Sequence, residues 1–150
     1  MFETKRYFTV NAMVLKAIEK EEKKYQRYYI GKLESVDAVL YTDGYTAYIV
    51  PSMYWMIDIN KISETHKINA ENLLCDNESD YKDAQYVGIE IANSKMYAKF
   101  VAENCTIYAD SKYIKGLEDL NVKVKDSRSP IRLYLNDRLY AMIMPVLRIN

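Results

Sequence analysis

The chain has 150 residues, a length typical of one domain that buries a hydrophobic core without disulfide support. Its composition, 49% hydrophobic and 28% charged with four glycines and three prolines, excludes a disordered, collagen-like or low-complexity protein. The 21 basic side chains balance the 21 acidic ones. No apolar run approaches the ~20 residues of a membrane span, and the first residues lack the apolar core of a signal peptide. We therefore expect a soluble cytoplasmic protein.

The zero net charge hides an uneven distribution along the chain. Basic residues outnumber acidic ones by eight to four in residues 1–33 and again in residues 111–150, whereas residues 34–110 hold thirteen acidic side chains and five lysines. Basic ends around an acidic middle are compatible with a surface that faces nucleic acid. They are equally compatible with an ordinary solvated surface.

The first element that we predict is a short strand, Arg6–Val10, followed by a helix that begins at Asn11, a typical N-cap residue, and ends at about Arg27. The helical period of about 100° per residue places the basic residues of this helix on one side. They are Lys16, Lys20, Lys23, Lys24 and Arg27. Such a stripe suits contact with phosphates, but a solvated helix face stabilised by Glu–Lys pairs has the same pattern.

From Tyr28 onward the hydrophobic pattern changes to that of β-strands rich in Tyr, Val and Ile. We predict strands at Tyr28–Leu33, Ala38–Thr42, Tyr45–Val50 and Met53–Ile59. Asp43-Gly44 is a strong signal for a two-residue hairpin turn between two of them. A short helical piece at Asn69–Leu74 and a polar loop at residues 76–80 follow.

The second half begins with a hairpin of two strands, 86–92 and 95–102, around a turn at Asn93-Ser94, and a further strand follows at 106–108. Asp110 is then a suitable N-cap for a helix over Ser111–Leu120. Its lysines, Lys112 and Lys115, point away from its apolar side. The last predicted strands are 122–125, 131–135 and 139–144, with a turn at Asn136-Asp137 between the last two.

In this order the predicted elements repeat. A strand, a helix and three or four strands occupy about residues 5–60, and a strand, a helix and three strands occupy residues 105–150, with a loop and a hairpin between them. We therefore predict an α+β protein, a single domain over residues 1–150, built from duplicated βαβββ units with antiparallel sheets and two helices on one face.

Residues with metal-binding or catalytic chemistry are few. Cys75 and Cys105 lie thirty residues apart and the only histidine is His66, which does not match the spacing of a zinc site. No glycine-rich phosphate loop and no Ser–His–Asp or Cys–His grouping is present. We therefore expect no cofactor, no metal and no catalytic activity.

Three stretches carry a resemblance to a known family. Arg6–Asn11 followed by Val14-Leu15-Lys16 looks like a strand leading into a helix, Leu40–Tyr45 contains Thr-Asp-Gly, and Leu139–Val146 runs into a Met-Pro pair near the chain end. Together they resemble one domain of the DNA sliding clamp, the bacterial processivity factor of replicative DNA polymerases. The resemblance implies a clamp-like fold that extends over nearly all of the chain.

The resemblance also implies a role in DNA replication for the basic residues. In sliding clamps the helices face double-stranded DNA, and their basic side chains contact phosphates without reading bases. Here that role passes to the five basic residues of the first helix and to Lys112 and Lys115 of the second.

A second implied site is a hydrophobic pocket that captures a peptide of a DNA polymerase or of another clamp-binding partner. Its walls would be Thr42, Gly44 and Tyr45 on one side and Met144, Pro145 and Val146 on the other. A plain hairpin turn and the end of a core strand explain the same residues.

Because the chain resembles one clamp domain, a ring would need a homo-oligomer, six copies for six domain positions. The alternative is a protein-interaction module of clamp fold, from a phage or mobile element, that binds a protein partner without encircling DNA.

Overall fold

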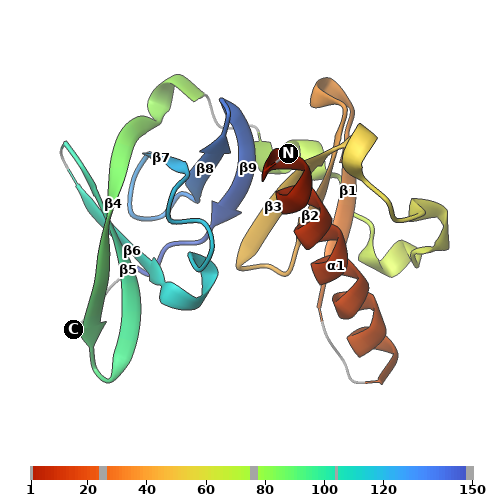
Figure 1. The fold of residues 1–150 in the computed structure, drawn as a ribbon, viewed down its shortest axis with the longest axis horizontal. Coiled ribbons are helices and arrows are strands. Elements are labelled where there is room, and N and C mark those ends of the chain that lie inside the picture. Colours follow the sequence, from red (N-terminus) through yellow and green to blue (C-terminus); the bar gives the residue numbers. More distant parts are fainter. Residues whose placement is uncertain (1, 24–26, 75–77, 104, 148–150) are drawn as a thin grey trace. The chain divides into compact units, whose positions relative to one another are not determined.

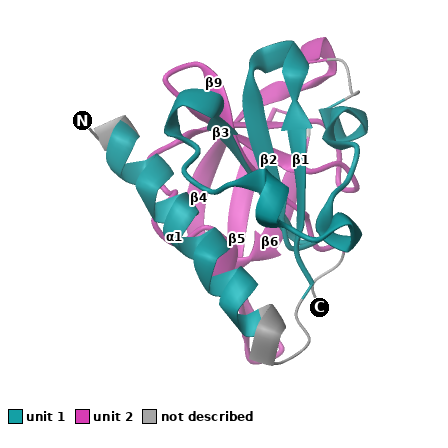
Figure 2. Ribbon diagram, turned by 90° about the vertical axis from the view of Figure 1, so that its right-hand side faces the viewer, with its two compact units in different colours: residues 1–75 teal, residues 76–150 magenta. Residues whose placement is uncertain are grey.

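The computed structural model describes residues 2–23, 27–74, 78–103 and 105–147 (Figure 1). The chain forms two compact units, Met1–Cys75 and Asp76–Asn150, and each is described by itself below (Figure 2). No helix in the described part of the chain combines the length and the apolar character needed to cross a bilayer.

Unit 1 begins with one long helix, α1 (Phe2–Lys23). Its buried side chains follow the helical spacing of three and four residues, which gives the helix a single packing face. They are Tyr7, Val10, Asn11, Val14 and Ala17. The predicted strand at Arg6–Val10 is therefore wrong, because the helix already includes these residues.

Asn11 lies inside α1 and is not its N-cap. Its Nδ2 donates to the carbonyl oxygens of Tyr7 and Tyr54, both at 2.9 Å, and its Oδ1 accepts from the Met56 N–H at 3.0 Å. The Tyr7 and Tyr54 rings stack with centroids 5.0 Å apart. A single buried amide thus ties α1 to the segment that follows the last strand of this unit.

The sheet of unit 1 is an antiparallel meander of β1 (Tyr29–Leu33), β2 (Ala38–Thr42) and β3 (Thr46–Pro51). These strands confirm three of the predicted ones. The fourth prediction, a strand at Met53–Ile59, is wrong: a 3-10 turn at Ser52–Tyr54 follows β3 directly. The Trp55 N–H donates to the Ser52 carbonyl oxygen and the Met56 N–H donates to the Asn11 Oδ1, so these two groups are bonded without a neighbouring strand.

The rest of unit 1 consists of 3-10 turns at Ile59–Lys61, Glu64–His66 and Ala70–Leu74. The last of them lies where a short helical piece was predicted. Gly31 lets this segment approach β1, because a Cβ at Gly31 would lie only 2.6 Å from the Ile68 carbonyl oxygen.

Unit 2 is an antiparallel sheet with the strand order β9-β8-β7-β4-β5-β6. Its strands are β4 (Lys82–Ala92), β5 (Lys95–Ala102), β6 (Thr106–Asp110), β7 (Asn121–Val124), β8 (Ile131–Leu135) and β9 (Arg138–Ile143). The tight turns Asn93-Ser94 and Asn136-Asp137 have positive φ at both residues, as a two-residue hairpin requires, and both were predicted. The core side chains of this unit include Phe100, Ile107, Ile114, Ile131, Leu133 and Ile143.

The second predicted helix is much shorter than expected. Asp110 caps it as predicted, accepting from the Lys112 N–H at 3.1 Å, but only a 3-10 helix at Ser111–Tyr113 follows. The chain continues in successive three-residue turns that bury Ile114, Leu117 and Leu120. A spacing of three residues fits 3-10 turns as well as an α-helix, which explains the overprediction.

The α+β class and the antiparallel sheets are confirmed. The duplication does not have the predicted form. From β6 onward the order is strand, 3-10 turn and three strands, as expected for the second repeat with its helix shortened. The first repeat lacks its leading strand, because those residues belong to α1.

Candidate functional site

The outer face of α1 carries two of the predicted DNA-binding residues. Lys16 and Lys20 are exposed and one turn apart, on the side of the helix opposite the buried face. Lys24 and the side chain of Lys23 lie outside the described residues. Arg27 is exposed in the segment before β1 and not in the helix. The structure thus places two lysines of the predicted stripe together on one helix face.

This outer face is not purely basic. Phe8 and Leu15 are about half exposed along one flank of it, and Glu19 is exposed beside the lysines. A phosphate backbone can contact the lysines, and an apolar partner surface can contact the aromatic and leucine side chains. The face can therefore support two kinds of contact.

Lys112 and Lys115 are exposed in the turns after β6. The Lys112 ammonium lies 3.9 Å from the Asp110 carboxylate and 4.9 Å from the centroid of the Tyr113 ring. Glu118 follows nearby in the chain and is exposed too. The Asp110 carboxylate therefore offsets the charge of Lys112, and α1, with two exposed lysines on one face, is the better candidate for contact with an anion.

The Thr-Asp-Gly motif forms the hairpin loop between β2 and β3. The Asp43 Oδ1 accepts from the N–H groups of Tyr45 and Thr46, at 2.8 and 2.9 Å, and the Thr42 Oγ1 donates to the Thr46 carbonyl oxygen at 2.6 Å. The loop has three residues where two were predicted, and Gly44 adopts φ +96°. These bonds give every polar residue of the motif a structural role and leave Tyr45 pointing outward.

The Met-Pro pair follows β9 in unit 2. Met144 is exposed, and the Val146 N–H donates to the Tyr108 carbonyl oxygen of β6 at 2.8 Å. Pro145 is partly buried between them. The two predicted walls of the peptide pocket therefore belong to different units of the chain.

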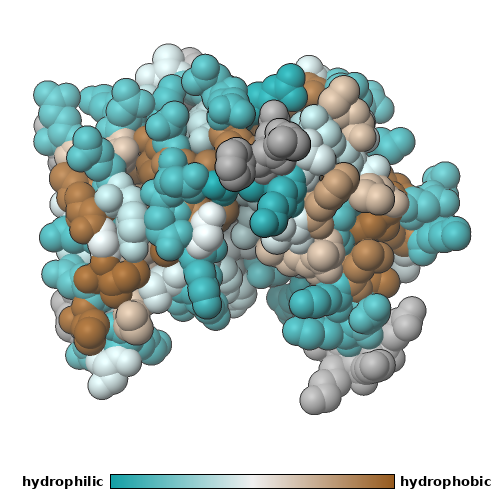
Figure 3. Space-filling model, viewed as in Figure 1, coloured by the Kyte–Doolittle hydropathy of each residue, from teal (hydrophilic) through white to brown (hydrophobic). Residues whose placement is uncertain are grey.

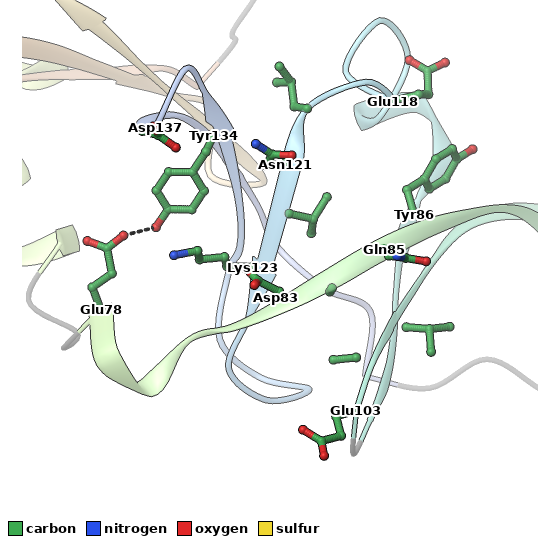
Figure 4. Close-up of a pocket in the computed structure, with 15 residues that line it drawn as sticks. Glu78, Asp83, Gln85, Tyr86, Glu103, Glu118, Asn121, Lys123, Tyr134 and Asp137 are labelled. Atoms are coloured by element: carbon green, nitrogen blue, oxygen red, sulfur yellow. Dashed lines mark hydrogen bonds between the residues drawn. The ribbon is translucent and has the colours of Figure 1, made fainter.

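Unit 2 contains a cavity of about 910 Å³ that the sequence did not predict (Figure 4). It lies where β4 diverges from β7: the two strands pair as far as Ala84 and Val122, and beyond that pair Gln85 and Asn121 line the cavity. Five carboxylates line it together with one basic residue, Lys123. The carboxylates are Glu78, Asp83, Glu103, Glu118 and Asp137. We call it the acidic cavity.

A hydrogen bond and a cation–π contact connect three of the residues that line one side of the acidic cavity. The Tyr134 hydroxyl donates to the Glu78 carboxylate at 2.8 Å, and the Lys123 ammonium lies 5.3 Å from the Tyr134 ring centroid (Figure 4). Burial, together with the bond to Glu78, raises the pKa of Tyr134 to about 12. This tyrosine therefore stays protonated at neutral pH and acts as a hydrogen-bond donor, not as a base.

Within the ranges that the structure describes, no three His, Cys, Asp or Glu side chains converge as metal ligands. The cavity residues come from separate segments of the chain, and no motif of close spacing links them. The one signal in the sequence was the excess of acidic residues in its middle, which did not reveal their grouping.

None of the protein-family models, curated proteins or solved structures that were compared with the chain matches it. The resemblance to sliding clamps therefore rests on two sequence motifs, Leu40–Tyr45 and Leu139–Val146, because the third, a strand that leads into a helix at Arg6–Asn11, lies wholly within α1.

Proposed function

We propose that this protein is a non-catalytic, sliding-clamp-like protein that associates with double-stranded DNA through the outer face of α1. The observation that carries the proposal is the pair of exposed lysines, Lys16 and Lys20, one turn apart on the face opposite the buried stripe. Ammonium groups placed in this way contact phosphates without reading bases, as a protein that moves along DNA requires.

The expected affinity of one copy is low. Each phosphate contact contributes a slope of about −0.9 to the dependence of log K on log salt, so two contacts predict a loss of about twelvefold between roughly 50 and 200 mM salt. Self-association would multiply the number of α1 faces that meet one duplex and raise the avidity without any new contact.

The test is a double charge reversal, Lys16→Glu with Lys20→Glu, assayed by fluorescence anisotropy on a labelled duplex of random sequence. The matched control reverses Lys32 and Lys61, two exposed lysines of the same unit that lie outside α1. The proposal predicts salt-dependent binding that the α1 pair abolishes and the control pair largely retains. Equal loss in both double variants would show that net charge, and not the α1 face, governs binding.

A second candidate function is a protein-interaction module of clamp-like fold that binds a partner without encircling DNA. It is supported by apolar side chains that remain open to solvent at two predicted pocket positions: Tyr45 is 63% exposed and Met144 is 42% exposed. This candidate predicts that Tyr45→Ala and Met144→Ala each weaken binding of Leu- and Phe-containing peptides while DNA binding is unchanged. Exposed Val36→Ala is the control. Unaltered peptide affinity in both pocket variants would count against it.

A further inference from the structure

Strand β4 has an outer edge that no strand of unit 2 covers among the described residues. Its pairing with β7 ends at Ala84, whereas its pairing with β5 continues to Ala92. Residues 85–92 therefore have a strand on one side only, and we call this stretch the β4 edge. Unpaired backbone groups along such an edge are a template for an added strand.

The β4 edge carries little of what usually blocks pairing with another chain. It contains neither lysine nor proline, and its irregularity is one bulge at Val87, next to Gly88 with φ +119°. Beyond the bulge, Gly88–Ala92 forms a regular ladder with β5. This regular part can accept the main-chain hydrogen bonds of a further strand.

Exposed apolar side chains lie along the β4 edge. Val87, Ile89 and Ile91 are all exposed, Ile91 at 72%, and the cross-strand neighbour of Ile91 is the exposed Met96. Figure 3 shows hydrophobic side chains gathered over this hairpin, at the left of the view. Alternating apolar positions of an added strand would cover them.

The acidic cavity lies at the inner end of the same edge. Gln85 and Tyr86 belong both to the edge and to the lining of the cavity, and Glu118 lies across from Tyr86 (Figure 4). Burial and the charge of Glu118 raise the pKa of Tyr86, consistent with this proximity. A strand added along the edge would thus begin or end beside several carboxylates.

We propose that the β4 edge binds an extended partner peptide that is apolar at alternate positions and carries lysine or arginine at the end next to the acidic cavity. The main chain of the peptide pairs with Gly88–Ala92, its apolar side chains cover Ile89 and Ile91, and its basic end approaches Glu118. Charge complementarity selects this occupant over an acidic or polyanionic one, because five carboxylates and one lysine line the cavity. The proposal uses no residue of α1 and stands apart from the proposed function.

The probe is a fluorescein-labelled synthetic peptide of alternating valine and threonine with two lysines at each end, so that either strand direction brings a basic end to the acidic cavity. It is titrated with the full chain and followed by anisotropy. Two control peptides share its length: one has glutamate in place of lysine, and one carries N-methyl groups on alternate backbone nitrogens. We expect the first peptide to bind and both controls to bind at least tenfold more weakly. Hydrogen exchange of the Gly88–Ala92 amides should slow when the first peptide is bound.

A matched pair of variants tests the acidic end. Glu118→Lys should weaken the lysine peptide by about three- to tenfold, the range of one exposed charge pair and its reversal. Asp119→Lys, which changes the net charge equally but lies outside the cavity lining, should stay within about twofold. Any one of three results would overturn the proposal. The N-methylated peptide could bind as tightly as the first peptide, the Gly88–Ala92 amides could exchange at an unchanged rate, or the first peptide could fail to bind at about 1 mM.

Discussion

The buried amide of Asn11 allows a quantitative test of how α1 is held in unit 1. Asn11→Ala removes the bonds to the Tyr54 carbonyl oxygen and from the Met56 N–H, both of which join segments far apart in the chain. Each bond contributes about 1 kcal/mol, and leaving partly buried partner groups unpaired costs about 1 kcal/mol more. Alanine favours the helix over asparagine by about 0.5 kcal/mol, which offsets part of the loss. We expect the free energy of unfolding of unit 1 to fall by about 2–3 kcal/mol.

The assay is urea unfolding followed by the fluorescence of Trp55, the single tryptophan of the chain, which lies between the two bonded residues. The matched control is Thr9→Ala. It also removes a side-chain hydrogen bond within α1, from the Thr9 Oγ1 to the Lys5 carbonyl oxygen, but on the exposed side. The control should cost less than about 0.5 kcal/mol. If Asn11→Ala cost no more than the control, the apolar face alone would hold the helix, and the reasoning above would be refuted.

Two further predictions concern unit 1. Gly31→Ala should destabilise it by about 2–4 kcal/mol, because the new methyl group would lie 2.6 Å from the Ile68 carbonyl oxygen. The midpoint of urea unfolding measures this effect, and an unchanged midpoint would contradict the close approach. Burial, and to a smaller extent the charge of Asp43, raises the pKa of Tyr41 to about 12. Its contribution to stability should therefore be complete below pH 10 and disappear as the pH rises from about 10 to 12, and Tyr41→Phe should flatten this part of the stability profile.

Turn chemistry explains which elements the sequence predicted well. Asn93-Ser94 and Asn136-Asp137 adopt the positive φ angles that these residue types tolerate. The strands around them lie within one residue of their predicted bounds, except that β4 begins at Lys82, four residues before its predicted start. In such cases the local residues determine the structure almost alone. Strand Ala38–Thr42 was predicted to the residue for the same reason, since the Asp43 side chain closes its hairpin.

Long-range partners explain the failures. Tyr7-Phe8-Thr9-Val10 consists of aromatic and β-branched residues, which favour strands. Asn11 is a good N-cap by residue type, but the side chain of Asn11 instead bonds Tyr54 and Met56, more than forty residues away. A helix that begins at Phe2 becomes apparent only once those partners are known. The acidic cavity was missed for a related reason. It forms where the pairing of β4 with β7 stops at Ala84 while the pairing of β4 with β5 continues, and the sequence does not reveal where a strand pair stops.

The separation of charge by element has a functional consequence. Exposed lysines lie on α1 in unit 1, whereas the carboxylates of the acidic cavity lie in unit 2, so a neutral chain offers one surface to anions and another to cations. Both proposed interactions should weaken with salt, so salt alone cannot distinguish them. Variants of the two surfaces can: Lys16→Glu with Lys20→Glu should abolish DNA binding and leave the lysine peptide bound at the β4 edge, whereas Glu118→Lys should weaken binding of the peptide and not of DNA. If either change weakened both ligands equally, the assignment of separate surfaces would fail.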